Sequence, residues 1–578
     1  MKNSFKCIFL IFSLFFLVSC KRESDSNGNV LNMALSGEVS TLDPANAYDT
    51  ISASVIYQSY EQLYEYHYLK RPYTIIPLLA QEMPIVENNG KRYTIKIKKG
   101  VRYHDDPCFN GKERFVTAQD FINQIKRLAF KGTNSNGWWL FDGKIVGINK
   151  FRDEVETDFE KFKSMNIEGL KATDDQTLVI DLVEPFPQML FALTMSFTSP
   201  MPMEAIETYK NLLNDRMIGT GPYQMDKYNP LSGVKLVRNP YFRKTLYPEE
   251  GDRMANSMNL LKDAGKQIPF IDAIQFQIIK ESQTRWLNFM AKKVDVLSIP
   301  KDNFESAIDP TGNLTSQLKK EGIQLQIFPT LTYWWLSFNM KDPLLGKNKN
   351  LRLAIAHAIN TDSYIDTFTN SIGQKANSIY PPGIPGYNPS ATLPYKFDLK
   401  IAKEYLSKAG FPDGKGIPEL TFDVRGTSST HRQQAEFVKR ELERIGINVK
   451  IVLNTFPAFL EKARFGKLQF WQDGWALDYP DAENVLQLLI SKNHPPGPNA
   501  TYYSNEVFNN LYEKIRTIPE GEEKWNLMGK MENIINEDMP WVMLYYARNY
   551  ILFQKRLNNY RHSDVIYNNI KYLKLDAQ

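Results

Sequence analysis

The chain contains 578 residues, with 43% apolar and 23% charged side chains and a formal net charge of +5. These fractions are typical of globular domains, and the absence of a second apolar run of about eighteen residues excludes a multi-span membrane protein. Basic residues form only short runs such as 96–99, so we expect no nucleic-acid partner. A chain of this length predicts about two or three lobes.

The N-terminal segment has the features of a bacterial lipoprotein signal. Two lysines precede an apolar stretch at 7–18, and the small Ser19 stands directly before Cys20. An apolar core of about twelve residues is too short to span a bilayer as a mature helix. We therefore predict that residues 1–19 are removed, that Cys20 is lipidated, and that 20–29 form a flexible linker. The protein would be tethered to a membrane outside the cytoplasm.

This location restricts both the chemistry and the role of the cysteines. ATP, NAD and coenzyme A are not supplied outside the cytoplasm, which leaves binding, hydrolysis or scaffolding. Cys7 leaves with the signal and Cys20 is committed to lipid, so Cys108 is alone in the mature chain. No intramolecular disulfide is therefore possible, and we expect Cys108 to be an ordinary buried or half-buried residue.

Strand and helix patterns alternate along the chain. Alternating apolar and polar residues predict strands at 91–98, 177–182, 234–238 and 447–453. Helical spacing predicts helices at 117–128, where Thr117 and Asp120 form a capping pair, and at 432–445, which Gly446 ends. This interleaving favours α/β lobes. A polar stretch at about 244–268 is interpreted as an inserted surface loop or helix.

The sequence lacks the common catalytic and metal-binding motifs. It contains no phosphate-binding loop, no zinc-protease helix and no serine nucleophile elbow. The histidines stand singly, without the short spacings of metal sites, at His67, His104, His357, His431, His494 and His562. We therefore expect no cofactor, no metal and no enzymatic activity.

Aromatic residues form three clusters, at 333–340, 470–481 and 541–546. Core packing accounts for most such rings. Asp478 is less easily explained by packing, because an ionised carboxylate between Leu477 and Tyr479 requires a cation or several hydrogen bonds. If the protein supplies no cation, a ligand amine would fill that role.

Several short motifs follow one another in the order of a known family. They are Leu42-Asp43-Pro44, Tyr60-Glu61-Gln62-Leu63-Tyr64-Glu65, Gly219-Thr220-Gly221-Pro222-Tyr223, Val237-Arg238-Asn239-Pro240-Tyr241, Leu351-Arg352-Leu353-Ala354 and Asp478-Tyr479-Pro480-Asp481. With these motifs, the chain resembles the substrate-binding proteins of the peptide/nickel ABC-transporter family, family 5. The resemblance covers about five hundred residues of the chain.

The resemblance implies an α/β, two-lobed, periplasmic-binding-protein-like hinge fold with an extra α/β domain inserted in the first lobe. Lobe I would comprise 30–73, 200–331 and 540–578. The inserted domain II would be 74–199, and lobe III would be 332–539.

The resemblance also implies a site. Peptides in this family bind extended between the lobes, and their main chains pair with strand edges of the protein. Asp478 occupies the position that holds the ligand's α-ammonium group. Gly474 and Ala476 would offer backbone hydrogen bonds from one lobe, and Glu61 and Leu63 from the other.

Further ligand contacts are expected along the same strands. Gln472 stands where oligopeptide receptors can place an arginine for the ligand carboxylate, and His431 is a candidate to act there instead. The remaining candidates for ligand contacts are Trp475, Tyr333, Asn339 and Tyr545.

The leading hypothesis is a lipid-anchored, monomeric receptor that delivers oligopeptides or dipeptides to an ABC permease. A receptor of the same fold for a nickel chelate, haem or sugar is an alternative. A peptide-sensing or peptide-hydrolysing extracytoplasmic protein is another. The first two hypotheses differ in whether Asp478 meets a ligand amine. Turnover of peptides would indicate a hydrolase, and a gene without permease neighbours would indicate a sensor.

Overall fold

The structure of the protein is a computed structural model, which describes residues 29–427, 429–454, 456–495 and 497–576. The predicted signal peptide at 1–19, the lipidation residue Cys20 and all of the linker except Asn29 lie outside these ranges. Within them, no helix combines the length and apolarity that a membrane crossing requires. The single described cysteine, Cys108, is buried, as predicted.

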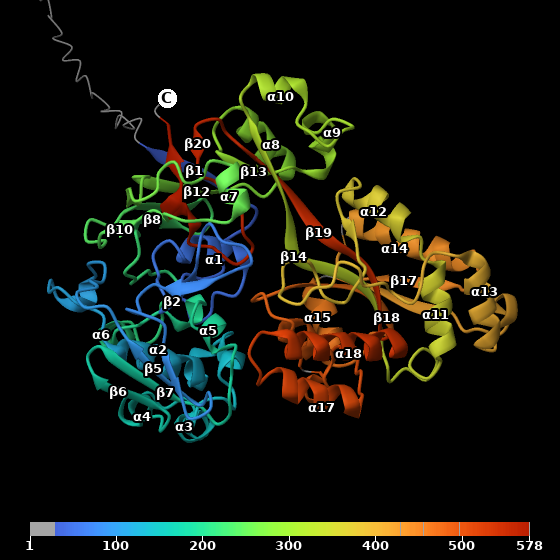
Figure 1. The fold of residues 1–578 in the computed structure, drawn as a ribbon, viewed down its shortest axis with the longest axis horizontal. Coiled ribbons are helices and arrows are strands. Elements are labelled where there is room, and N and C mark those ends of the chain that lie inside the picture. Colours follow the sequence, from blue (N-terminus) through green and yellow to red (C-terminus); the bar gives the residue numbers. More distant parts are fainter. Residues whose placement is uncertain (1–28, 428, 455, 496, 577–578) are drawn as a thin grey trace, which may run out of the picture.

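Two bodies are joined by a pair of long strands (Figure 1). The N-terminal body comprises 29–323 and the C-terminal segment 554–576, and the second body comprises 339–540. The linking strands are β14 (Gln324–Phe338) and β19 (Trp541–Phe553), which pair antiparallel. Their register shifts between Pro329 and Tyr333, so the pairing is broken at the point where the strands pass from one body to the other. This geometry is suited to a hinge.

One eleven-stranded sheet runs through both bodies. Its N-terminal part consists of β13 (Val296–Ser298), β1 (Val30–Leu35), β12 (Ala273–Ile278), β9 (Gly233–Arg238) and β8 (Tyr223–Asn229). Its part in the second body consists of β18 (Phe470–Ala476), β16 (Leu420–Val424) and β17 (Val449–Leu453), and β15 (Gln374–Lys375) pairs with β19. The sheet therefore carries the hinge at its centre.

A separate four-stranded sheet lies within the range 74–199. Its strands, in spatial order, are β4 (Ile85–Glu87), β5 (Arg92–Lys96), β7 (Thr177–Asp181) and β6 (Leu170–Asp174). The accompanying helices are α2 (Ala118–Ala129), α3 (Ile148–Val155), α4 (Phe159–Ser164) and α5 (Met189–Ala192). Residues of this unit, such as Ile180, share one apolar core with Leu31 of the large sheet. The unit is therefore packed firmly on the rest of the N-terminal body.

Helices cover the sheet of the second body (Figure 1). They are α11 (Lys349–Ala358), α12 (Thr361–Thr369), α13 (Leu399–Lys408), α14 (Ser429–Glu443), α15 (Phe456–Arg464), α17 (Glu506–Ile515) and α18 (Glu522–Asp538). The mixed α/β architecture agrees with the sequence-based expectation. The predicted capping pair of α2 is also present, with the Thr117 amide donating to Asp120 at 2.9 Å.

The stretch at 244–268 forms a small excursion. Strands β10 (Thr245–Leu246) and β11 (Gln267–Ile268) pair antiparallel, and the short helix α7 (Arg253–Ser257) lies between them. Asp252 forms an ion pair with Arg561 at 2.6 Å, so the excursion is fastened to the C-terminal segment.

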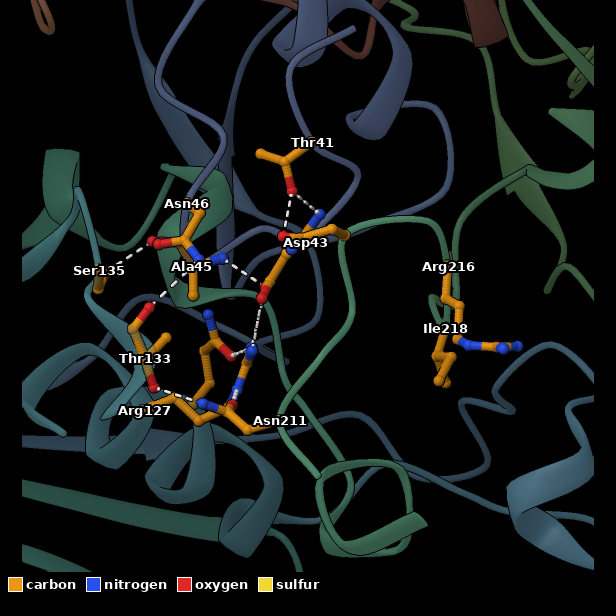
Figure 2. A network of polar contacts seen from close by, with 12 residues as sticks. Thr41, Asp43, Ala45, Asn46, Arg127, Thr133, Ser135, Asn211, Arg216 and Ile218 are labelled. Carbon is orange, nitrogen blue, oxygen red and sulfur yellow. Dashed lines mark hydrogen bonds and ion pairs between the residues drawn. The ribbon is translucent and has the colours of Figure 1, made fainter. Parts of the chain in front are cut away.

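A buried ion pair holds the turn that follows Asp43 (Figure 2). Arg127 of α2 binds Asp43 through both terminal nitrogens, at 3.0 and 2.6 Å, and both side chains are at most 1% exposed. The Arg127 Nε also donates to Asn211 at 2.6 Å, and Asp43 accepts from the Ala45 amide at 2.9 Å. This network holds the turn after Asp43 against α2 and so positions Tyr48.

Candidate functional site

A cavity of about 850 Å³ lies between the two bodies. The N-terminal body contributes Tyr48, Trp139, Asp142, Gly143, Lys144 and Phe186 to its wall. The facing wall comes mainly from β18 and the segments after it, and it includes Gly474, Trp475, Asp478, Tyr479 and Glu483. A concave cavity of this size, lined by aromatic rings and by charged side chains, is typical of a ligand site.

Asp478 lies on this wall just after β18 and bonds to both bodies. The Tyr48 hydroxyl of the N-terminal body donates to its Oδ1 at 2.9 Å, and the side-chain amide of Asn484 donates to its Oδ2 at 3.0 Å. Asn484 also accepts from the indole nitrogen of Trp475 at 2.9 Å, which fixes the local geometry. Among the described residues, no lysine, arginine or histidine forms an ion pair with Asp478.

The surroundings of Asp478 disfavour the ionised form of its carboxyl group. Burial raises the pKa of the Asp478 carboxyl, and the hydrogen bonds from Asn484 and Tyr48 offset this effect only in part. A cationic group entering the cavity would restore the balance, because it would stabilise the ionised form. The site therefore favours a cationic ligand group.

The edge of β18 beside Asp478 is open. Within the described ranges, β18 pairs with β14 along its length, but on its other side it meets β16 only at Phe470 and Trp471. The amide of Leu477 donates to the Leu331 carbonyl, so alternate residues direct their backbone groups toward β14. The backbone groups of Gly474 and Ala476 consequently point to this edge, where the Gly474 amide donates to Asp473 Oδ1 at 2.9 Å and the Gly474 carbonyl accepts from Arg425 Nη1 at 3.4 Å.

A side chain at position 474 would disturb this edge. A Cβ atom there would lie 2.5 Å from the ring of Trp334 on the neighbouring strand. The indole therefore packs over the backbone of Gly474, which explains why glycine is required at this position.

The predicted ligand contacts fall into three groups. Asp478, Gly474 and Trp475 line the cavity between the bodies, and Ala476 is exposed beside them on β18. His431 and Tyr545 line a second cavity of about 150 Å³, together with Gln472.

The other predicted contacts lie outside both cavities. Glu61 is buried and forms an ion pair with Arg243 at 2.6 Å, and the carbonyl of Leu63 accepts from two backbone amides of its own body. Tyr333 is fully buried and stacks on Trp335, and Asn339 donates to the Leu468 carbonyl at 2.8 Å. Internal bonding accounts for Glu61, Leu63 and Asn339, and Tyr333 is held by packing, although its buried hydroxyl has no hydrogen-bond partner within the described ranges.

Arg425, which the sequence analysis did not select, lines both cavities. It follows directly after β16, and its Nη1 donates to Asp473 at 3.1 Å beside Gly474. The parallel pairing of β16 with β18 brings it there, and the sequence offers no local sign of that pairing. Tyr48 and Lys144 were missed for the same reason, because both belong to the opposite body.

Further contacts join the bodies at the rim of the cavity. Arg516 of the second body forms an ion pair with Glu184 at 2.6 Å, and Phe191 stacks on Tyr479 with ring centres 5.4 Å apart. These contacts belong to a closed arrangement of the two bodies. No cluster of three or more metal-ligating side chains occurs in the described part of the chain.

Comparisons with known proteins identify the class. The model of the family described as "Bacterial extracellular solute-binding proteins, family 5 Middle" matches residues 74–496. The chain therefore belongs to the family 5 extracellular solute-binding proteins, which are transport receptors and not enzymes. The resemblance drawn from the sequence motifs is thereby confirmed, and the family acts outside the cytoplasm.

Individual relatives agree with this assignment. The chain is 23% identical to the dipeptide-binding protein of Escherichia coli, covering 84% of this chain and 83% of that one. It is 25% identical to the oligopeptide-binding protein OppA of Bacillus subtilis, covering 91% and 89%.

A solved structure of the same fold is DppA of Helicobacter pylori in complex with the peptide STSA. It superposes with a TM-score of 0.74 at 26% identity, covering 95% of this chain and 98% of that one. The two-lobed fold predicted from the sequence is confirmed.

Proposed function

We propose that the protein is a receptor that binds peptides in the cavity between its two bodies and delivers them to an ABC importer. The observation that carries this proposal is Asp478, a carboxylate on the cavity wall without a cationic partner among the described residues. The α-ammonium group of a peptide is a cation of the right size. Peptide binding by the relatives supports the same conclusion.

The open edge of β18 supplies the second element of recognition. The backbone groups of Gly474 and Ala476 face this edge, and an extended peptide would pair with Ala476 directly and with Gly474 in exchange for its contacts to Asp473 and Arg425. Main-chain pairing is common to all peptides and gives affinity without side-chain selectivity. Trp475, which lines the cavity beside this edge, would pack against the bound chain. The proposed contacts are therefore Asp478, Gly474, Trp475 and Ala476.

We propose a lesser role for the second cavity. Arg425 lines both cavities, so the second cavity adjoins the first at this residue. A ligand side chain that extends past Arg425 would reach His431 and Tyr545 in the second cavity. Glu61, Leu63, Tyr333 and Asn339 would support the fold without touching the ligand.

The membrane attachment is a separate part of the proposal. Residues 1–19 would direct export, and a lipid on Cys20 would tether the receptor near the importer and raise its local concentration there. The wild type should incorporate a labelled fatty acid, and Cys20→Ser should not. Equal labelling of the two proteins would contradict the tether. We expect the receptor to act as a monomer.

The function is tested by ligand screening. Ligand that binds only the folded protein raises the melting temperature by mass action. Peptide pools of increasing length should raise the melting temperature, and mass spectrometry should find peptides co-purifying with the protein. If no peptide of any length shifts the melting temperature, and a nickel chelate, haem or sugar does, the peptide assignment is wrong.

A further inference from the structure

We infer that Lys144 forms an anion subsite of this cavity and makes the receptor selective for peptides that carry a carboxylate away from the N-terminal amine. The inference rests on the proposed peptide-binding function. It concerns the wall of the N-terminal body, which faces the wall that carries Asp478.

The position of Lys144 is fixed by its backbone. The residue lies in the loop before α3, where its amide donates to the Phe141 carbonyl at 3.0 Å and its carbonyl accepts from the Val183 amide at 2.9 Å. The adjacent Ile145 forms a β-bridge with Leu182. The loop is therefore held at both sides of Lys144, and the side chain starts from a rigid base.

The ammonium group of Lys144 lies among cavity-lining rings. It stands 4.3 Å from the ring centre of Phe186 and 6.0 Å from that of Trp139. Within the described ranges, it donates one hydrogen bond, to the backbone carbonyl of Leu140 at 3.2 Å. An ammonium group offers three donors, so in this structure the group has capacity for further acceptors.

No carboxylate within the described ranges forms an ion pair with Lys144. Glu483 is the nearby acidic residue with the strongest effect, but its oxygens accept from the hydroxyls of Tyr479 and Tyr512. Asp142, Lys492 and Arg516 are the other charged neighbours, and Arg516 is already paired with Glu184 and Glu513. Burial lowers the pKa of Lys144, as expected for an ammonium group that lacks a counter-ion.

The neighbouring Trp139 carries a donor that lacks an acceptor. The indole nitrogen of Trp139 is buried and makes no hydrogen bond within the described part of the chain. A carboxylate has two oxygens and binds most strongly where charged and neutral donors converge. The ammonium group of Lys144 supplies the charged donor of such a site, and it lies 6.0 Å from the ring centre of Trp139.

Two residues of opposite charge, Asp478 and Lys144, thus lie on facing walls of the cavity. Asp478 would hold the amine of a peptide, and Lys144 would hold either its C-terminal carboxylate or an acidic side chain. The C-terminal carboxylate and an acidic side chain would bind Lys144 in the same way. Peptides that carry only one of these two carboxylates are therefore needed to tell which of them binds.

The test uses calorimetry of the full mature protein with defined peptides. The first pair is Ser-Thr-Ser-Ala with a free C-terminus and the same peptide as its carboxamide. The second pair is the carboxamides of Ser-Thr-Glu-Ala and Ser-Thr-Gln-Ala. The wild type should bind the carboxylate member of at least one pair about tenfold or more tightly than its neutral partner. The first pair reports the C-terminus and the second an acidic side chain.

The variant Lys144→Met should abolish this discrimination and leave the affinity for the neutral peptides within about threefold of the wild type. Methionine keeps the apolar packing on Phe186, and unchanged affinity for neutral peptides shows that the variant is folded. The matched control Lys492→Met removes an exposed lysine from the same cavity and should retain the discrimination. Discrimination that survives in Lys144→Met, or that both variants lose equally, would overturn the subsite.

The two proposals fail in different ways. If the wild type binds all four peptides equally well, the anion subsite is wrong and the peptide receptor stands. If none of them binds and the melting screen also finds no peptide, the proposed function itself is wrong.

Discussion

The hydroxyl of Tyr48 donates a hydrogen bond to Asp478 across the cavity, with 2.9 Å between the oxygens, and so joins the two bodies at the proposed ligand amine site. A ligand ammonium group that binds Asp478 adds positive charge at the point where the bodies meet. Binding and closure of the hinge are therefore coupled, because the closed state offers the carboxylate more partners than the open state does.

The pH dependence of stability should differ between the wild type and Asp478→Asn. The folded protein holds the proton of the Asp478 carboxyl more tightly than the unfolded chain does, since burial raises the pKa of this carboxyl from its ordinary value of 3.8. The stabilisation that this proton provides is therefore fully present below pH 3.8. It is lost as the pH rises from 3.8 through the folded-state pKa, and it amounts to about 1.4 kcal/mol for each unit by which the two pKa values differ. Asparagine does not titrate, so its melting temperature relative to the wild type should rise over this range.

A constant offset between the melting temperatures of Asp478→Asn and the wild type from pH 4 to 7 would contradict the burial of an uncompensated carboxylate.

The ion pair between Arg127 and Asp43 should be essential for stability. Removing one partner leaves a buried charge without compensation, so Arg127→Met should cost about 3–5 kcal/mol in the free energy of unfolding. The exposed pair of Lys375 with Asp362, at 2.7 Å, provides the control, and Lys375→Met should cost less than about 1 kcal/mol. Urea unfolding measures both variants, and similar small losses would refute the structural role of the buried pair.

The ion pair between Arg516 and Glu184 should slow ligand release. Because this pair joins the two bodies and is partly exposed, Glu184→Gln should weaken the closed state by about 0.5–1 kcal/mol, which is roughly a two- to fivefold faster dissociation. Stopped-flow tryptophan fluorescence can follow the release, since Trp139 and Trp475 line the cavity.

Glu513→Gln is the matched control for this measurement. Glu513 also binds Arg516 at 2.6 Å, but both residues belong to the second body, so the contact between the bodies remains. Equal acceleration by the two variants would show that Glu184 acts through charge alone and not as a link between the bodies.

Local patterns were sufficient to predict many of the elements. The helix at Ala118–Ala129 follows from its apolar spacing and from the Thr117 cap, and the strand at Thr177–Asp181 follows from its alternation. These features depend on neighbours in the sequence. Asp478 could be selected for a related reason, because a carboxylate among adjacent aromatic residues is costly without a partner.

Residues that depend on contacts distant in the sequence could not be predicted in this way. Tyr48 and Asp478 are 430 positions apart, and only the folded chain brings them together. Glu61 was selected from its motif, but its carboxylate binds Arg243, which lies 182 positions away. The sequence around Lys144 does not distinguish it from the other lysines. Only the fold places it among cavity-lining rings, without a carboxylate partner in the described ranges.

The central claim is that Asp478 binds the α-ammonium group of a peptide. Calorimetry should compare the tightest peptide from the melting screen with its N-acetylated form, on the wild type and on Asp478→Asn. The wild type should bind the free amine more tightly than the acetylated peptide by about 2 kcal/mol or more, which is roughly 30-fold in Kd, and the variant should bind both weakly and alike. Unchanged affinity of Asp478→Asn for the free peptide would contradict the account.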